Sequence, residues 1–147
     1  MNDPAEIRDI LSQARTIAIV GLTDNPSRPA YGVAAYLQRA GYTVIPVGPS
    51  QEVLGERAYP DIPSVPVPID LVDIFRRSDR VLPHVQEAIQ VGAPAVWLQM
   101  GIRNLEAEQL AERAGLVVVA DRCTKVDHFH FAASGQLDRR HPARDAA

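Results

Sequence analysis

The sequence predicts an α/β fold, in which a doubly wound parallel sheet lies between two helical layers in a single domain. Short β-branched runs alternate along the chain with segments of helical periodicity. The strand segments are continuous apolar runs, which indicates that both faces of each strand are covered. A chain of 147 residues is long enough to bury one core of its own. Together these observations predict a three-layer arrangement.

The elements can be assigned in chain order. An acidic amphipathic segment opens the chain, and a helix over 31–41 presents an apolar face and stops at Gly41. Further helices are predicted over 82–92 and 104–115, the second capped by Asn104, and an amphipathic helix is predicted to follow the last strand. The predicted strands cover residues 16–20, 42–47, 70–77, 94–101 and 116–123, with at most a short one within the proline-rich segment 56–68. The domain is predicted to span 1–135, and residues 136–147 lack apolar periodicity and are predicted to form a flexible C-terminal tail.

Composition and charge exclude several classes of protein. The net charge of −3 gives no support for a nucleic-acid-binding surface, which normally shows a basic excess. A single cysteine, Cys123, rules out an intramolecular disulfide. No apolar run approaches the roughly 20 residues that cross a bilayer, and the first residues do not read as a signal peptide. The sequence therefore predicts a cytoplasmic protein that does not bind membranes.

The segment between the first strand and the first long helix has the composition of a phosphate-binding loop. It reads GLTDNPSRP over 21–29. Gly21 lets the backbone turn sharply and approach a ligand, and two hydroxyl side chains are available as donors. Pro26 stiffens the loop, and Arg28 adds positive charge where the helix amino terminus also attracts anions. The alternative is an ordinary strand-to-helix turn with a surface arginine.

Neither common nucleotide motif fits this loop. An NAD site normally places an acid at the end of the second strand, where this chain has Gly48-Pro49-Ser50. A nucleoside triphosphatase needs the P-loop lysine and a Mg²⁺-binding hydroxyl, and the loop does not supply that pair. The proline-walled tip of the second strand is better suited to an adenine ring. After the fourth strand, Phe75 provides an apolar platform, and Arg76 and Arg77 provide forked donors, although a solvated basic pair is the alternative.

Five stretches, spread in order over about residues 5–132, resemble the small stand-alone coenzyme A-binding proteins of bacteria and archaea. They are IAIVGLTDNPSRPAYGVAAYL, GYTVIPVGP, DLVDIFRR, AVWLQMGI and GLVVVADRCTKVDH. That family is similar in fold to the CoA-binding domain of the succinyl-CoA synthetase α subunit. The resemblance implies a Rossmann-like parallel sheet of five or slightly more strands, with coenzyme A lying across the strand ends.

The resemblance also implies a set of CoA-binding residues. The phosphates would lie at the first loop, the nucleotide half beside the end of the second strand, and the pantetheine arm towards 99–101. The implied residues are Gly21, Leu22, Thr23, Pro26, Arg28, Tyr31, Val47, Gly48, Pro49, Phe75, Arg76, Arg77, Gln99, Met100 and Gly101. Gly48 departs from the pattern, because relatives commonly carry asparagine there. The synthetase uses a phosphohistidine from another domain, for which this chain is too short.

No catalytic residue and no metal site is predicted. Cys123 follows the last strand near Arg122 and Lys125, whose charges favour a reactive thiolate, but a small buried cysteine is the preferred interpretation. His128 and His130 form an H-x-H pair after Asp127, which is interpreted as the polar, solvent-facing side of a helix.

The predicted function is binding of CoA or acyl-CoA as a carrier, sensor or accessory module without its own chemistry. The alternatives are an enzyme that uses Cys123 for thiol or acyl exchange, an NAD-type binding protein, and a subunit that docks on a larger partner. The sequence leaves a homo-oligomer open.

Overall fold

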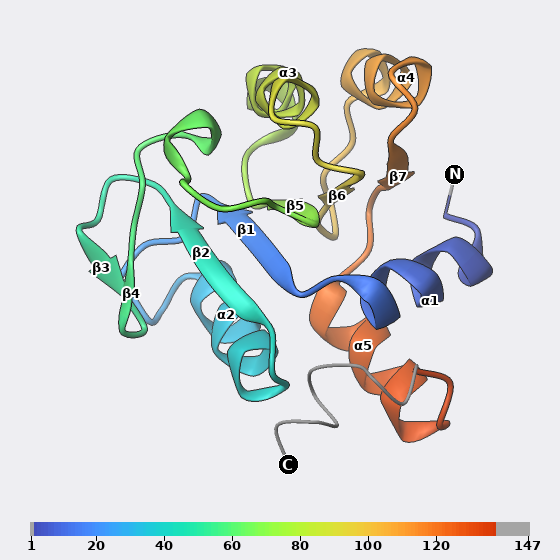
Figure 1. Cartoon of the computed structure of the whole chain (residues 1–147), viewed down its shortest axis with the longest axis horizontal. Coiled ribbons are helices and arrows are strands. Elements are labelled where there is room, and N and C mark those ends of the chain that lie inside the picture. The colour runs from blue at the N-terminus through green and yellow to red at the C-terminus, as the bar shows by residue number, and fades with distance from the viewer. Residues whose placement is uncertain (1, 138–147) are drawn as a thin grey trace.

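The structure, a computed structural model, describes residues 2–137 (Figure 1). Five parallel strands form the sheet in the order β2-β1-β5-β6-β7. The strands are β1 (Thr16–Val20), β2 (Thr43–Val47), β5 (Leu71–Ile74), β6 (Ala95–Leu98) and β7 (Val117–Val119). The chain runs from β1 outwards to β2 and then returns to the other side of β1 with β5, so the strand order reverses between β1 and β5. This confirms the predicted doubly wound parallel sheet.

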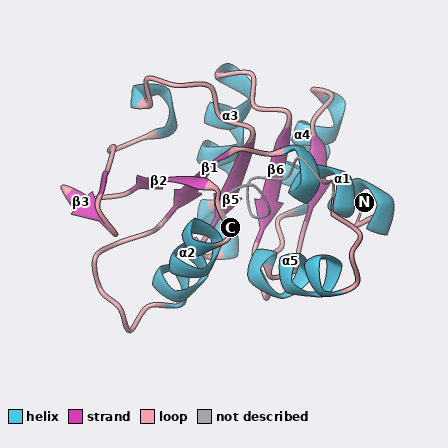
Figure 2. Cartoon of the chain, turned by 60° about the horizontal axis from the view of Figure 1, so that its bottom comes forward, coloured by secondary structure: helices cyan, strands magenta, loops and turns pink. Residues whose placement is uncertain are grey.

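Helices cover both faces of the sheet (Figures 1 and 2). One layer contains α1 (Pro4–Gln13), α2 (Pro29–Arg39) and α5 (Thr124–Ala133), and the other contains α3 (Leu82–Gln90) and α4 (Leu105–Arg113). Asn104 caps α4 as predicted, since its side chain accepts a hydrogen bond from the N–H of Ala107. Among the elements of residues 2–137, no helix is long and apolar enough to cross a bilayer.

The connection from β2 to β5 differs in detail from the prediction. The short strand expected within 56–68 is β4 (Glu56–Arg57), and it pairs antiparallel with β3 (Glu52–Val53) outside the main sheet. Two short 3₁₀ helices follow, η1 (Ile62–Ser64) and η2 (Ser78–Arg80). The strands predicted over 70–77 and 94–101 end at Ile74 and Leu98, because the chain turns into loops at the carboxyl edge of the sheet.

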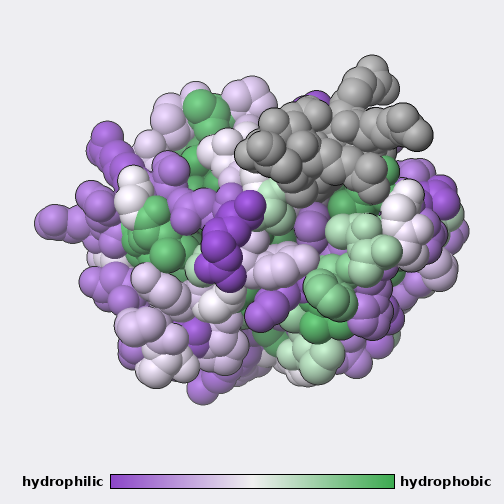
Figure 3. All heavy atoms as spheres, turned by 90° about the horizontal axis from the view of Figure 1, so that it is seen from below, coloured by the Kyte–Doolittle hydropathy of each residue, from purple (hydrophilic) through white to green (hydrophobic). Residues whose placement is uncertain are grey.

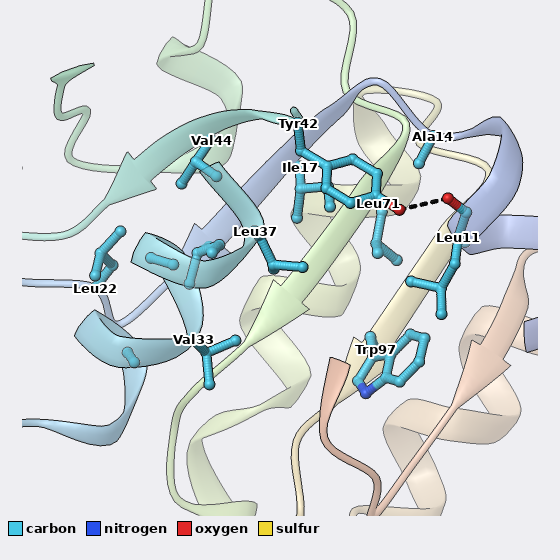
Figure 4. Packing of buried hydrophobic residues seen from close by; sticks show 14 of the residues in the cluster. Leu11, Ala14, Ile17, Leu22, Val33, Leu37, Tyr42, Val44, Leu71 and Trp97 are labelled. Atoms are coloured by element: carbon cyan, nitrogen blue, oxygen red, sulfur yellow. Dashed lines mark hydrogen bonds between the residues drawn. The ribbon is translucent and has the colours of Figure 1, made fainter. Parts of the chain in front are cut away.

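The core is divided by the sheet into two apolar clusters. On the side of α1, α2 and α5, Trp97 of β6 and Leu71 of β5 pack against Leu11 and Leu37 (Figure 4). The hydroxyl of Tyr42 donates a hydrogen bond to the carbonyl of Leu11, which ties α1 to the start of β2. The outer face of this layer is mostly polar, with apolar areas over α5, where Val126 and Phe129 are exposed (Figure 3).

The first two residues of the predicted C-terminal tail lie within the part of the chain that the structure describes. Leu137, within the predicted tail 136–147, is buried in the same cluster as Trp97. Residues 138–147 lie outside the part of the chain that the structure describes.

Candidate functional site

The candidate residues come together where the strands end at the carboxyl edge of the sheet. Backbone hydrogen bonds continue the ladder one residue beyond the strands: the N–H of Gly21 donates to Val47 at 2.9 Å and that of Phe75 to Val20 at 2.9 Å. The four segments 21–31, 47–49, 75–77 and 99–101 therefore leave adjacent strands β1, β2, β5 and β6 at the same edge. In open parallel sheets this edge, next to the reversal of strand order, is where ligands bind.

Two glycines allow the loops to pack against each other. Gly21 has a φ of 88°, and a Cβ at this position would lie 2.2 Å from the carbonyl oxygen of Phe75. A Cβ on Gly48 would lie 2.8 Å from the carbonyl oxygen of Leu22. The first loop is therefore held between the ends of β2 and β5 by backbone contacts that a side chain would prevent. Any side chain in place of Gly48 would require the first loop to shift.

The first loop uses some of its polar groups to maintain its own conformation. The side-chain oxygen of Asn25 accepts hydrogen bonds from the N–H of Ser27 at 3.0 Å and from its hydroxyl at 2.7 Å. The hydroxyl oxygen of Thr23 accepts from the N–H of Asn25 at 3.3 Å, which leaves its own proton for another acceptor. The two hydroxyls predicted as ligand donors therefore differ, because the Ser27 proton is already used within the loop.

The amino terminus of α2 has no side-chain cap. Arg28 occupies the N-cap position with extended backbone angles, makes no capping hydrogen bond, and is followed by Pro29 in the first turn. The Arg28 side chain is exposed and forms no ion pair with any residue of the 2–137 segment. Tyr31 follows in the first turn of α2 and is half-buried. A free guanidinium thus lies beside the positive end of a helix dipole, an arrangement that favours an anion.

The two arginines after β5 have different surroundings. Arg77 pairs with Asp79, with Nε 3.3 Å from a carboxylate oxygen. Arg76 is exposed and forms no ion pair within the part of the chain that the structure covers. Burial and, second, the positive charge of Arg76 lower the pKa of His84. Arg76 is thus the more available of the two donors, while Arg77 would first have to leave Asp79.

The end of β6 contributes one buried and two exposed residues. Gln99 is only 4% exposed, whereas Met100 is 66% exposed. Gly101 is exposed, and its N–H donates to the Asp121 carboxylate at 2.6 Å, which ties the loop after β6 to the loop after β7. The amide nitrogen of Gln99 instead points into the protein, where it donates hydrogen bonds to Asp73 and Thr124.

Sequence reasoning missed Asp73, which is the partner of Gln99. Asp73 is 0% exposed, and one carboxylate oxygen lies 2.6 Å from Nε2 of Gln99 while the other lies 2.9 Å from the hydroxyl of Thr124. Burial raises the pKa of Asp73 to about 7, and the two hydrogen bonds partly oppose that shift. An acid inside the apolar run LVDIF was the available signal.

The start of α5 was interpreted only partly correctly. Asp127 and His128 are buried, so the interpretation of these two as solvent-facing is wrong, although His130 is exposed. Asp127 accepts two hydrogen bonds of 2.7 Å from Arg122, and Nδ1 of His128 lies 2.8 Å from the hydroxyl of Tyr36. These polar groups are buried because they have partners. No three His, Cys, Asp or Glu side chains between residues 2 and 137 are placed to hold a metal ion.

Cys123 lies at the N-cap of α5 and is partly exposed. The alternative of a reactive thiol depends on the positive charge of its neighbours, and the charge of Arg122 is engaged by Asp127. Cys123 also packs against the core cluster that contains Trp97. Its surroundings therefore give less support to a reactive thiol than the sequence alone did.

A cavity of about 390 Å³ lies at the opposite edge of the sheet, where the strands begin. Its lining includes apolar residues such as Ile10 and Val117 and three acidic residues, Glu6, Asp9 and Asp70. Three carboxylates would repel a polyanion such as a coenzyme with a pyrophosphate. The carboxyl edge, with Arg28 and Arg76, has the charge that such a ligand requires.

Comparison with known proteins agrees with the fold and with the sequence resemblance. Residues 15–129 match the family model of the CoA binding domain. The uncharacterized protein YneT of Bacillus subtilis is 41% identical over 125 residues, which is 84% of this chain and 93% of YneT. A hypothetical protein of Pyrococcus horikoshii is 38% identical with a TM-score of 0.84, covering 88% of this chain and 92% of its own.

A larger protein shares the same fold in one part of its length. The dinucleotide-forming acetyl-coenzyme A synthetase 1 of Ca. Korarchaeum cryptofilum matches 78% of this chain but only 28% of its own, with 24% identity and a TM-score of 0.68. At that identity the likeness concerns the fold alone. The family match, which spans all five strands of the sheet and all four candidate segments, is the stronger result. This chain belongs to the CoA binding domain family.

Proposed function

We propose that the protein binds coenzyme A or an acyl-CoA at the carboxyl ends of β1, β2, β5 and β6, and acts as a carrier, sensor or accessory module. Membership of the CoA binding domain family supports the class of ligand. The observation that carries the location is the uncapped amino terminus of α2 with the free guanidinium of Arg28. Beside it, Gly21 and Gly48 leave backbone surfaces to which a phosphate can come close.

The proposed pose follows the order of the strands. The pyrophosphate lies at the first loop against Arg28, and adenine lies on the tip formed by Gly48 and Pro49. The pantetheine arm runs past Phe75 towards Gln99. An NAD-type pose is less well supported, because an acid that could hold the ribose hydroxyls is missing from the tip of β2, and Glu52 belongs to the β3–β4 hairpin.

Calorimetric titration with CoA and with NAD tests the proposal directly. CoA is expected to bind with the higher affinity, because the tip of β2 lacks the acid that holds the adenosine ribose hydroxyls of NAD, and the adenosine ribose of CoA carries a 3′-phosphate that such an acid would repel. Tighter binding of NAD than of CoA would contradict the proposal. Mass spectrometry of small molecules that copurify with the protein provides an independent check and identifies the acyl group.

Replacing Arg28 with alanine is expected to weaken CoA binding by about 1.5–3 kcal/mol, because a charge-assisted hydrogen bond to phosphate is lost. Arg39→Ala is the matched control, since Arg39 is an exposed arginine in the last turn of the same helix. Isothermal calorimetry on both variants checks the prediction. Equal affinities of the two variants would remove Arg28 from the site.

Replacing Cys123 with serine separates a binding module from an enzyme that exchanges thiols or acyl groups. The proposed module retains its CoA affinity within about twofold, because Cys123 contributes packing and no contact with the phosphates. Incubation of wild type with CoA disulfide or acetyl-CoA, followed by intact-protein mass spectrometry, provides the chemical readout. A stoichiometric adduct that Cys123→Ser abolishes would favour the enzyme.

A further inference from the structure

Three side chains from three different elements form a closed hydrogen-bonded group at the carboxyl edge. We call Asp73 of β5, Gln99 at the end of β6 and Thr124 at the start of α5 the Asp73 cluster. Nε2 of Gln99 lies 2.6 Å from one oxygen of Asp73 and 2.8 Å from the hydroxyl oxygen of Thr124. That hydroxyl lies 2.9 Å from the second oxygen of Asp73. All three residues are buried.

The protons of this cluster can be assigned because an ionised carboxylate only accepts hydrogen bonds. The two amide protons of Gln99 go to Asp73 and to Thr124, and the hydroxyl proton of Thr124 goes to Asp73. Every donor within the cluster is then used. The amide of Gln99 must therefore turn its nitrogen towards Asp73, and its oxygen, Oε1, must face the other way.

The free oxygen of Gln99 is the group that remains for a ligand. Oε1 accepts no hydrogen bond from the residues between 2 and 137, and it is not among the fully buried side-chain atoms that lack a partner. It therefore retains contact with solvent at the strand end. Gln99 is followed by the exposed Met100 and Gly101, the segment to which the pantetheine arm is assigned in the proposed pose.

We propose that Asp73 is a positioning residue, whose carboxylate holds the Gln99 amide so that Oε1 accepts a hydrogen bond from an amide N–H of the pantetheine arm. This inference rests on the proposed function. Pantetheine carries two secondary amides, so an oriented acceptor at this place recognises the arm and not the nucleotide. The Asp73 cluster thus contributes selectivity for CoA over nucleotides that share its phosphates.

Protonation of Asp73 would reverse the orientation of the amide. A neutral carboxylic acid donates one hydrogen bond, and its best acceptor in the cluster is the amide oxygen of Gln99. The amide would then turn Oε1 inwards and present its N–H₂ to the ligand, where it meets another donor. Burial raises the pKa of Asp73 to about 7, so this change takes place near neutral pH.

The surroundings of Asp73 contribute no further charge to this equilibrium. Its neighbours in the sheet register are Ile19 of β1 and Trp97 of β6, neither of which is charged. From α5, the inward-facing ionisable groups are Asp127, paired with Arg122, and His128, bonded to Tyr36. The expected pH dependence of CoA binding therefore follows Asp73.

The pH dependence has opposite signs for binding and for stability. As pH rises through about 7, Asp73 ionises, Gln99 presents its oxygen, and CoA binds more tightly. The folded-state pKa of Asp73 lies above its unfolded value of 3.8, so its contribution to stability is complete below that value and is lost as pH rises from there through about 7. If Asp73 had only a structural role, CoA affinity would change with pH in the same direction as folding stability. The positioning role instead predicts that affinity rises while stability falls.

The experiment compares CoA with adenosine 3′,5′-bisphosphate, which carries a 3′-phosphate and lacks the pantetheine arm. Affinities of the wild type and of Asp73→Asn are measured calorimetrically from pH 6.5 to 8.5. For the wild type, the preference for CoA over the bisphosphate is expected to rise about threefold with pH, because one hydrogen bond is worth about tenfold and Asp73, with a pKa of about 7, is already about one-quarter ionised at pH 6.5. For Asp73→Asn, which accepts from Gln99 but does not ionise, the preference is expected to stay constant.

The outcomes separate this inference from the proposed function. Failure of both ligands to bind the wild type at any pH contradicts the proposed function, and the inference falls with it. Binding of both with a wild-type preference that does not change with pH contradicts the inference alone, as does the same rise in Asp73→Asn.

A second measurement needs only folded wild-type protein and covers the case in which Asp73→Asn does not fold. The side-chain ¹⁵N–¹H resonances of Gln99 are followed by NMR across the same pH range. A titration with a midpoint near 7 supports the inference. Resonances that do not move across this range contradict it.

Discussion

Replacing Gly21 with alanine is expected to destabilise the protein by about 2–6 kcal/mol and to abolish CoA binding. A non-glycine residue at a φ of 88° is strained by about 1–3 kcal/mol. The new Cβ would in addition lie 2.2 Å from the carbonyl oxygen of Phe75. To relieve this clash, β1 and β5 would have to separate at their ends, where the N–H of Phe75 donates to the carbonyl of Val20. This overpacking is expected to cost about 1–3 kcal/mol more.

Gly32→Ala is the matched control for this substitution. Gly32 lies in α2 a short distance along the chain, a Cβ there would meet nothing within 4 Å, and its φ is not positive. Alanine in a helix interior is expected to stabilise by about 0.5–1 kcal/mol. Urea unfolding of both variants measures the difference. A Gly21→Ala protein that unfolds at the wild-type urea concentration would show that the strand ends are not closely packed.

Replacing Trp97 with alanine is expected to cost about 3–5 kcal/mol, the range for removing a large aromatic side chain from a core. Trp97 is 0% exposed in the centre of the α1, α2 and α5 side of the core. Its indole N–H also donates to the carbonyl of Arg122 at 2.8 Å, which anchors the loop between β7 and α5. The substitution therefore leaves both a cavity and an unsatisfied carbonyl.

Two further variants separate these contributions. Trp97→Phe retains most of the packing but removes the donor to Arg122, so a loss of about 1–3 kcal/mol is expected from the unsatisfied carbonyl. Phe129→Ala removes an aromatic side chain that is 58% exposed on α5, and a change within about 0.5 kcal/mol is expected. Denaturant unfolding gives all three values. A Trp97→Ala loss no larger than that of Phe129→Ala would contradict the assigned core.

Most of the fold could be predicted because local patterns determine it. The apolar runs of β1 and β2 read as strands buried on both faces, and the structure buries them between two helical layers. Glycine and asparagine at helix ends marked the boundaries of α2 and α4. Parallel pairing followed from the alternation of strands and helices, which leaves few other ways to cover both faces of a sheet.

The details that escaped prediction depend on partners distant in the sequence. Asp73 is tolerated inside a strand because Gln99 and Thr124, 26 and 51 residues away, satisfy its carboxylate. His128 could be buried because Tyr36 lies 92 residues away in sequence but adjacent in space. Strand β3 and its antiparallel pairing with β4 were not predicted, because two residues in each strand are too few to produce a periodic pattern.

For the candidate site, the sequence by itself predicted which loops bind a ligand, and its resemblance to a known family gave the class of ligand, which the family match supports. Gly21, Arg28 and the missing acid after β2 are local features, and they predicted a phosphate-binding loop that fits neither the NAD motif nor the P-loop. Only the tertiary structure decided which polar side chains remain available to a ligand, because it determines which of them are already engaged in hydrogen bonds or ion pairs within the protein. Ser27 and Arg77 are engaged by Asn25 and Asp79. The side chain of Arg28 has no partner among residues 2–137. The amide of Gln99 is oriented by the buried carboxylate of Asp73, because buried polar groups need hydrogen-bond partners and the fold brings these two together.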